Sequence, residues 1–212
     1  MATTKATAKK KTATVSNKAR IATINRKTKE TDISVTINLD GTGQAQIDTG
    51  IGFFDHMLEG FAKHGLFDLK VKVNGDLHVD GHHSVEDCGI VLGQAISEAV
   101  GDKEGISRFG YFILPMDDAL ILTSIDLGGR FYIDYNCTMY SNKVGEFETQ
   151  LAREFFYALA SNANMNLHIR QLAGSNDHHT IEAMFKSFAK SLDMATKRDS
   201  RITGVLSTKG TI

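Results

Sequence analysis

The chain has 212 residues, of which 42% are hydrophobic and 23% charged, proportions that fit one large globular domain or two small fused ones. No apolar run is long enough for a transmembrane helix, so no membrane span is expected. The two cysteines, Cys88 and Cys137, are too few for a disulfide scaffold and favour a reducing compartment. We therefore expect a cytoplasmic protein.

The formal net charge of −1 conceals an uneven distribution. Residues 1–29 carry nine Lys or Arg and no acid, which leaves 15 basic and 25 acidic residues, a charge of about −10, for the rest. Residues 1–19 lack apolar periodicity and the apolar core of a secretory signal, so we predict a disordered basic tail. No aromatic and basic stripe in the body supports nucleic-acid binding, and the tail is too poor in Ser and Arg to favour organelle import.

The rest of the chain, 20–212, has the same order of predicted elements twice. Alternating apolar residues predict strands, and apolar residues at helical spacing predict helices. In the first half we expect strands at 31–39 and 44–48, a helix at 52–64, a strand at 67–73 and a helix at 84–100. In the second half we expect strands at 119–127 and 130–135, a helix at 148–163, a strand at 167–171 and a helix at 177–196.

This repetition predicts an α+β fold that arose by internal duplication of a β-β-α-β-α unit, with two related sheets and packed helices. The repeats extend over about 20–105 and 106–200, and a short C-terminal tail follows them. The residues between 44 and 48 are expected to return beside the preceding strand.

Each half contains one copy of an HHxxE string, at residues 82–86 and 178–182, and the two copies are 96 residues apart. Four of the eight histidines fall inside these strings, at the same offset from a glutamate. Capping or surface residues have no reason to repeat in register, so we interpret the strings as metal ligands. Imidazole and carboxylate together suit a divalent transition ion such as manganese, iron or zinc.

Helical geometry divides the ligands within each string. Residues four apart share one face of a helix, whereas neighbours diverge by about 100°. The first histidine and the glutamate can therefore chelate one ion, and the second histidine points toward another. The pairs are His82 with Glu86 and His178 with Glu182, and the lone imidazoles are His83 and His179.

A further ligand can come from the earlier helix of each unit. Alignment of FFDHML with AREFFY places His56 opposite Glu154, and both residue types can bind manganese. Asp80 and Asp87 flank the first string and could orient imidazoles or lie at the surface. The remaining histidines stand alone, and we interpret them as structural: His64, His78 and His168.

The chain resembles imidazoleglycerol-phosphate dehydratase of histidine biosynthesis in four segments: GFFDHMLEGFAKHGLFDL, GDLHVDGHHSVEDCGIVLGQA, GISRFGYFILPMDDAL and NDHHTIEAMFKSFAKSL. The resemblance runs from about Arg20 to the C-terminus, without the phosphatase domain that some members carry. It implies a carbon–oxygen lyase that converts imidazoleglycerol phosphate to imidazole acetol phosphate by loss of water. It also implies two Mn²⁺ ions per active site and a homo-oligomeric cage of 24 subunits, with sites between subunits.

The reaction of the family explains why a metal ion is needed. The proton to be removed lies on a carbon with no adjacent carbonyl, and a Lewis acid on the imidazole nitrogens favours the imidazolate. The electrons of the imidazolate then expel the neighbouring hydroxyl and give a diazafulvene-like intermediate. Loss of the proton from this intermediate gives an enol, which ketonises.

The resemblance also implies roles for single residues. The family's proton-transfer glutamate belongs to the segment that reads RKTKET here, which makes it Glu30. Glu154 departs from the family's pattern, because many relatives carry histidine at this position. Five residues at matching positions would hold the substrate phosphate: Arg108, Arg130, Lys186, and Ser207 with Lys209 in the terminal STKG.

Two other functions stay open from the residues alone. Paired metals also activate water, so a metallohydrolase acting on a phosphate ester would carry similar ligands. A cage whose ions only connect subunits would need no catalytic group at all. The division of the ligands between the two ions is open as well.

Overall fold

The computed structural model describes residues 19–212, so nearly all of the predicted basic tail, 1–19, lies outside the described residues. The first half contains β1 (Ile21–Lys27), β2 (Thr31–Asn38), β3 (Ala45–Asp48), α1 (Gly52–Gly65), β4 (Asp68–Gly75) and α2 (His82–Val100). The second half contains β5 (Phe109–Met116), β6 (Ala119–Asp126), β7 (Tyr132–Asn136), β8 (Lys143–Val144), β9 (Phe147–Glu148), α3 (Leu151–Asn162), β10 (Asn166–Ala173) and α4 (Asp177–Thr196).

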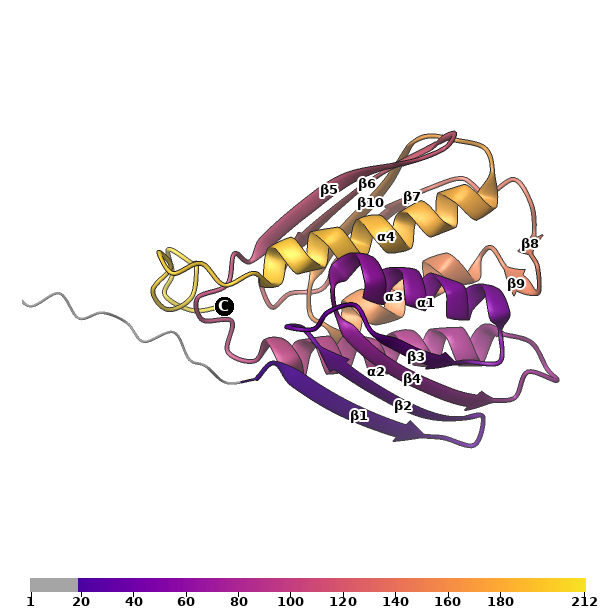
Figure 1. Ribbon diagram of the computed structural model, residues 1–212, viewed down its shortest axis with the longest axis horizontal. Coiled ribbons are helices and arrows are strands. Elements are labelled where there is room, and N and C mark those ends of the chain that lie inside the picture. Colours follow the sequence, from indigo (N-terminus) through magenta and orange to yellow (C-terminus); the bar gives the residue numbers. More distant parts are fainter. Residues whose placement is uncertain (1–18) are drawn as a thin grey trace, which may run out of the picture.

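The helices lie between two mixed sheets, with one sheet on each outer side (Figure 1). The strand order is β1-β2-β4-β3 in the first sheet and β5-β6-β10-β7 in the second, and β8 and β9 form a separate short ribbon. The two orders match strand for strand, so the predicted α+β fold and its internal duplication are confirmed. None of the helices in residues 19–212 is long and apolar enough to cross a membrane.

Each half begins with one strand more than the sequence pattern indicated. In β1 the inward positions are Ala22, Ile24 and Arg26, so the apolar alternation is weak. In β5 apolar side chains occupy both faces, which hides the period of two. Both extra strands are edge strands, and they make each unit β-β-β-α-β-α.

The third strand does not return beside β2 as expected. Instead, β3 pairs in parallel with β4, with Ile47 opposite Val71. The connecting loop is held by Asp68, whose Oδ1 accepts hydrogen bonds from the backbone N–H groups of Thr42 and Gln44 at 2.8 and 3.1 Å. Gly41 permits this approach, because a Cβ there would lie 2.3 Å from the Asp68 nitrogen.

Strand registers align the two halves residue by residue. Ala22 pairs with Ile37 in the first sheet, and Gly110 pairs with Ile125 in the second, which places the two hairpins 88 residues apart. The turn between β1 and β2 and the turn between β5 and β6 therefore correspond position by position.

The helices of the two halves pack crosswise. The contacts join α1 to α4 and α2 to α3, and aromatic side chains fill the space between them. Gly89 and Gly93 let α2 approach α3 closely, because a Cβ at these positions would lie 2.7 Å from the Phe155 carbonyl oxygen and 2.4 Å from that of Leu159. The largest fully buried aromatic side chains are Phe54, Phe61, Phe67, Phe147, Phe155, Phe156, Phe185 and Phe188.

Candidate metal centre

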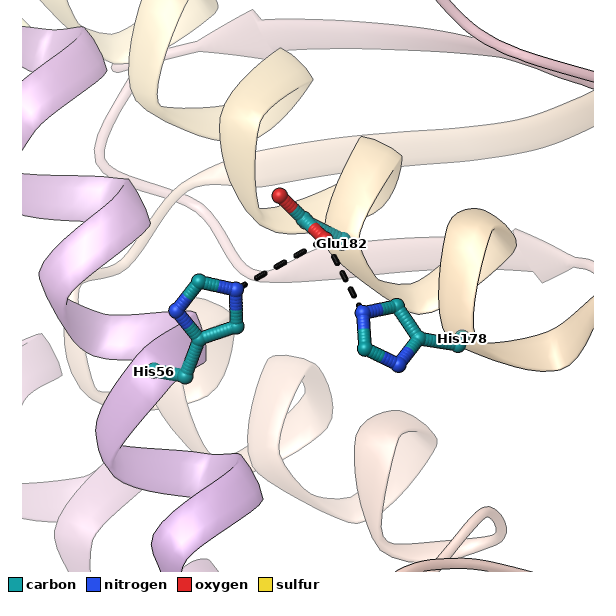
Figure 2. A group of neighbouring side chains, drawn as sticks. All are labelled: His56, His178 and Glu182. Carbon is teal, nitrogen blue, oxygen red and sulfur yellow. Dashed lines mark hydrogen bonds and ion pairs between the residues drawn. The ribbon is translucent and has the colours of Figure 1, made fainter.

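Three donors from α1 and α4 converge on one point (Figure 2). His178 Nε2 lies 3.2 Å from Glu182 Oε2, one turn later on α4, and His56 Nε2 on α1 lies 3.7 Å from the same oxygen. All three ligand atoms lie within 4.8 Å of one another, and no other such group of three occurs among residues 19–212. Ligands around one first-row ion lie roughly 3–3.5 Å apart, so the spacing suits an ion.

The carboxylate of this group is buried and charged. The Glu182 side chain is 9% exposed, whereas about half of each imidazole faces solvent. Burial raises the pKa of Glu182, but the hydrogen bond and charge of Lys186, with His56 and His178, outweigh burial and leave that pKa below its usual value. Lys186 Nζ lies 2.5 Å from Glu182 Oε1. The glutamate is therefore ionised at neutral pH, as a metal ligand must be.

The first string presents a similar but more open pair. His82 Nε2 lies 3.7 Å from Glu86 Oε2, and both side chains are 42% exposed. Glu154 on α3 is next to Arg153, with Nη1 to Oε1 at 3.4 Å, and does not complete a group of three as close as the one around Glu182. The first string thus has the predicted i,i+4 pair without a third donor in contact.

The register confirms that Glu154 corresponds to His56. Leu69 and Leu167 pair with the equivalent residues Ile37 and Ile125, and each leucine follows its candidate ligand by 13 residues. Since α3 packs on α2 as α1 packs on α4, the earlier helix of one half packs on the helix that carries the string of the other half. The three donors around Glu182 accordingly come from both halves.

The second histidine of each string turns aside, as predicted. The His83 ring is at 84° to the His82 ring, and the His179 ring is at 79° to that of His178. His83 is not paired with a residue of its own string. Instead, each of these imidazoles contacts a carboxylate from a neighbouring loop.

These carboxylates are Asp76, after β4, and Asp118, in the β5–β6 turn. Asp76 Oδ2 lies 3.0 Å from His83 Nδ1, and Asp118 Oδ1 lies 2.8 Å from His179 Nδ1. The hydrogen bond that His83 donates to Asp76 raises the pKa of His83, and the charge of Glu30 acts in the same direction. A carboxylate on Nδ1 fixes the ring and directs Nε2 away from that contact, as carboxylates hydrogen-bonded to metal-ligating imidazoles do. In His179, Nε2 lies 3.4 Å from Asp117 Oδ2.

Sequence reasoning missed both carboxylates and named Asp80 and Asp87 instead. Asp80 Oδ1 accepts a hydrogen bond from the backbone N–H of His82 at 2.8 Å, and Asp87 points to the strands under α2. Asp118 is in a turn at the same end of the fold as the second string, and this position is the one signal that could have identified it. The position becomes known only from the pairing of β5 with β6.

Glu30 lies in the turn between β1 and β2, near the first string. Its backbone N–H donates to Thr28 Oγ1 at 3.1 Å, and its side chain is exposed. Its charge acts to raise the pKa of His83. Thr31 Oγ1, at the end of the same turn, donates to Asp87 on α2, so the turn that carries Glu30 is tied to the helix of the first string.

The five predicted phosphate-binding residues are not gathered at one point in the single chain. Arg108 donates to Asp126 Oδ1 from Nε at 2.7 Å and to the Leu206 carbonyl from Nη1 at 2.8 Å, which brings it to the segment with Ser207 and Lys209. Lys186 lies earlier on α4, nine residues or about 13 Å before the Ala195 carbonyl that accepts the Arg108 N–H. Arg130 is exposed in the β6–β7 loop.

The fold and these clusters define a class of protein: a duplicated α+β chain in which two helix starts each present an HHxxE set of metal-ligand type. A family model described as imidazoleglycerol-phosphate dehydratase matches residues 49–192. The chain is 61% identical over 193 residues to the imidazoleglycerol-phosphate dehydratase of Lachnoclostridium phytofermentans, covering 91% of this chain and 98% of that protein. It is 53% identical over 194 residues to that of Synechococcus elongatus, covering 91% and 93%.

Solved structures agree. The crystal structure of imidazoleglycerol-phosphate dehydratase from Staphylococcus aureus has a TM-score of 0.77 at 37% identity, covering 84% of this chain and 99% of that one. The enzyme from Pyrococcus furiosus, crystallised with (S)-C348, has a TM-score of 0.77 at 39% identity, covering 89% and 100%. The chain belongs to the imidazoleglycerol-phosphate dehydratase family. The predicted family and enzyme class, a hydro-lyase, are confirmed.

Proposed function

We propose that this chain dehydrates imidazoleglycerol phosphate to imidazole acetol phosphate in histidine biosynthesis, with two Mn²⁺ ions in each active site. The convergence of His56, His178 and Glu182 is the observation that supports it most directly, because three such donors within 4.8 Å of one another have few structural uses. The proposed substrate is inferred from the family to which the chain belongs.

The donors fit the proposed ions. One ion takes His56, His178 and Glu182. The pseudo-equivalent ion takes His82, Glu86 and Glu154, where a carboxylate replaces the imidazole of His56. His83 and His179 point away from these pairs, and we propose that they reach ions held by neighbouring copies of the chain.

Each residue then has a defined task. When bound, the ions supply a Lewis acid that stabilises the anionic form of an azole ring. Loss of hydroxide from the carbon attached to such a ring gives a diazafulvene-like intermediate, and Glu30 takes the proton whose removal gives the enol. The phosphate is held by cationic and hydroxyl donors that fix the substrate relative to Glu30: Arg108, Arg130, Lys186, Ser207 and Lys209.

Two features support an oligomer with sites between subunits, up to the expected cage of 24. The phosphate residues lie at separate places in one chain, so a neighbouring copy would bring them together. The outer faces of the two sheets also differ. The positions of Thr23 and Asn25 on β1 are taken on β5 by Tyr111 and Ile113, which are 64% and 48% exposed. Apolar side chains exposed in a row mark an interface.

Turnover of imidazoleglycerol phosphate before and after chelation, and after return of manganese, tests the function. We expect activity to be lost with the metal and restored by Mn²⁺. Full activity in metal-free protein would contradict the proposal, and loss of assembly without turnover under any condition would favour a purely structural metal. Both cysteines are unpaired, which supports the cytoplasm as the place of the reaction.

A further inference from the structure

A buried carboxylate connects the first hairpin to the helix that carries the first string. Asp87 directly follows Glu86 on α2 and is 7% exposed. Its Oδ2 accepts a hydrogen bond from Thr31 Oγ1 at 2.5 Å, and Arg26 Nη1 lies 2.5 Å from the same oxygen. Thr31 and Arg26 are on opposite sides of the turn that contains Glu30, so one carboxylate holds both strands of the hairpin.

The turn itself is held by a second threonine. Thr28 Oγ1 accepts hydrogen bonds from the backbone N–H groups of Glu30 and Thr31 at 3.1 and 3.0 Å, and the Thr28 N–H donates to the Thr31 carbonyl at 2.8 Å. Thr31 thus belongs both to the turn and to the contact with Asp87. Through these bonds, the backbone of Glu30 is fixed relative to α2.

The second half of the chain shows that the fold does not need this network. By the hairpin register, Arg26 and Thr31 correspond to Leu114 and Ala119. By the offset of the two strings, Asp87 corresponds to Ala183. The β5–β6 hairpin packs on α4 without a charged group at any of these three positions. Since desolvation makes a buried ion pair a poor source of stability, the charged network in the first half requires another reason.

We propose that Asp87 is a positioning residue that holds the Glu30 turn at a fixed distance from His83 and the first string. The inference rests on the proposed role of Glu30 in proton transfer. Glu30 is in an exposed turn, and proton transfer tolerates little displacement, so a mobile turn would lower the rate without changing the ligands. Asp87 and Glu86 are neighbours on one rigid helix, so the position of Glu30 is fixed relative to the ion proposed at the first string.

The test compares Asp87→Asn, Glu30→Gln and the double variant. We expect Asp87→Asn to lower kcat roughly 10- to 100-fold, as small misplacements of a reacting group do, with KM and manganese content unchanged. In the Glu30→Gln background, Asp87→Asn should cause no further loss, because the group that it positions is already gone. Equal, multiplicative losses in both backgrounds would overturn the inference, since Asp87 would then act independently of Glu30.

A second variant guards against misfolding, because Asp87→Asn leaves the partly buried Arg26 without its charged partner. The triple change Arg26→Leu, Thr31→Ala and Asp87→Ala copies the second half and removes the charges together, which is far less destabilising than removing one. We expect a folded protein with full manganese content and a kcat lowered as in Asp87→Asn. Wild-type kcat in this variant would also overturn the inference.

The matched control is in the same hairpin. Lys27 and Asp32 form an exposed ion pair at 2.5 Å on the outer face, and replacing both by alanine should leave kcat unchanged. A loss as large as in Asp87→Asn would show that any change in the hairpin slows the enzyme, against a specific role of Asp87. Full turnover in Glu30→Gln alone would instead overturn the role of Glu30, and this inference with it.

Discussion

Asp118 occupies in the β5–β6 turn the position that Glu30 occupies in the β1–β2 turn. The two acids have different partners. Asp118 binds His179 Nδ1 at 2.8 Å, whereas the matching imidazole, His83, is bound by Asp76 from the loop after β4. In one half the acid of the turn orients an imidazole. In the other half a different residue does so, which leaves Glu30 for the proton transfer that we propose.

Glu30→Gln should lower turnover of imidazoleglycerol phosphate by about 10² or more, the usual effect of losing a general acid or base. The amide keeps the size of the side chain, and the backbone bond to Thr28 is unaffected. Manganese content and oligomeric state should therefore stay the same. Steady-state kinetics with metal analysis checks this, and an unimpaired kcat would remove Glu30 from the mechanism.

Asp76→Asn should weaken manganese binding roughly 10- to 100-fold, because the carboxylate that fixes the His83 ring is lost. His83→Ala should lower manganese content further, since the donor itself is removed. Titration against a competing chelator measures both affinities. Asp80→Asn serves as the control, because Asp80 accepts its hydrogen bond from the backbone N–H of His82 and not from the His83 ring. Normal metal content in His83→Ala would exclude His83 as a ligand.

Glu154→His should retain both manganese ions and most of the turnover, because it restores at this position the residue type of its counterpart His56. Glu154→Ala should lose part of the metal and fall in turnover. Metal content per chain distinguishes the two variants. If Glu154→Ala binds as much manganese as the unaltered protein, Glu154 is not a ligand, and the Arg153 pair is its only role.

Gly89→Ala should destabilise the fold by about 1–3 kcal/mol, because its Cβ would lie 2.7 Å from the Phe155 carbonyl and force α2 away from α3. Gly60→Ala is the matched control. Gly60 is also inside a helix, but a Cβ there meets nothing within 4 Å, so alanine should stabilise by about 0.5–1 kcal/mol. Chemical denaturation of both variants gives the difference, and equal stabilities would contradict the close packing of the helices.

The loop before β3 should make stability depend on acid pH. Hydrogen bonds from the backbone of Thr42 and Gln44 lower the pKa of Asp68. A carboxyl whose pKa is lower in the folded state contributes stability above its unfolded pKa, near 4, and loses it as pH falls through the folded value. Asp68→Asn should thus be less stable than the parent at neutral pH, and the difference should shrink in acid. Urea unfolding across this range measures the difference, and a constant gap would refute it.

The sequence predicted most of what depends on local pattern. The helix expected at 177–196 coincides with α4, and the spacing of His178 and Glu182 predicted their contact. The predicted helix at 148–163 was longer than α3 at its start, because Phe147 and Glu148 form β9 and Thr149 Oγ1 donates to the Ser141 carbonyl at 2.6 Å. Contacts between residues close together in the chain produce a periodic sequence pattern, and helices can be predicted from such a pattern.

What the sequence did not predict depends on contacts between distant segments. No periodicity reveals that His56 faces the string of the other half, or that β3 lies parallel to β4. Asp76 and Asp118 are ordinary loop acids until the fold brings them to imidazoles. These relationships arise from packing and register, which a single sequence does not display.

The crosswise packing of the helices has a consequence for origin. A half-length ancestor with one string and one earlier helix could not have closed a three-donor group within itself, because the third donor faces the string of the opposite half. Two such ancestors would have had to associate, each completing the other, as in a symmetric dimer. Gene fusion would have made that association permanent and let the twin sites diverge, one keeping an imidazole at position 56 and the other a carboxylate at position 154.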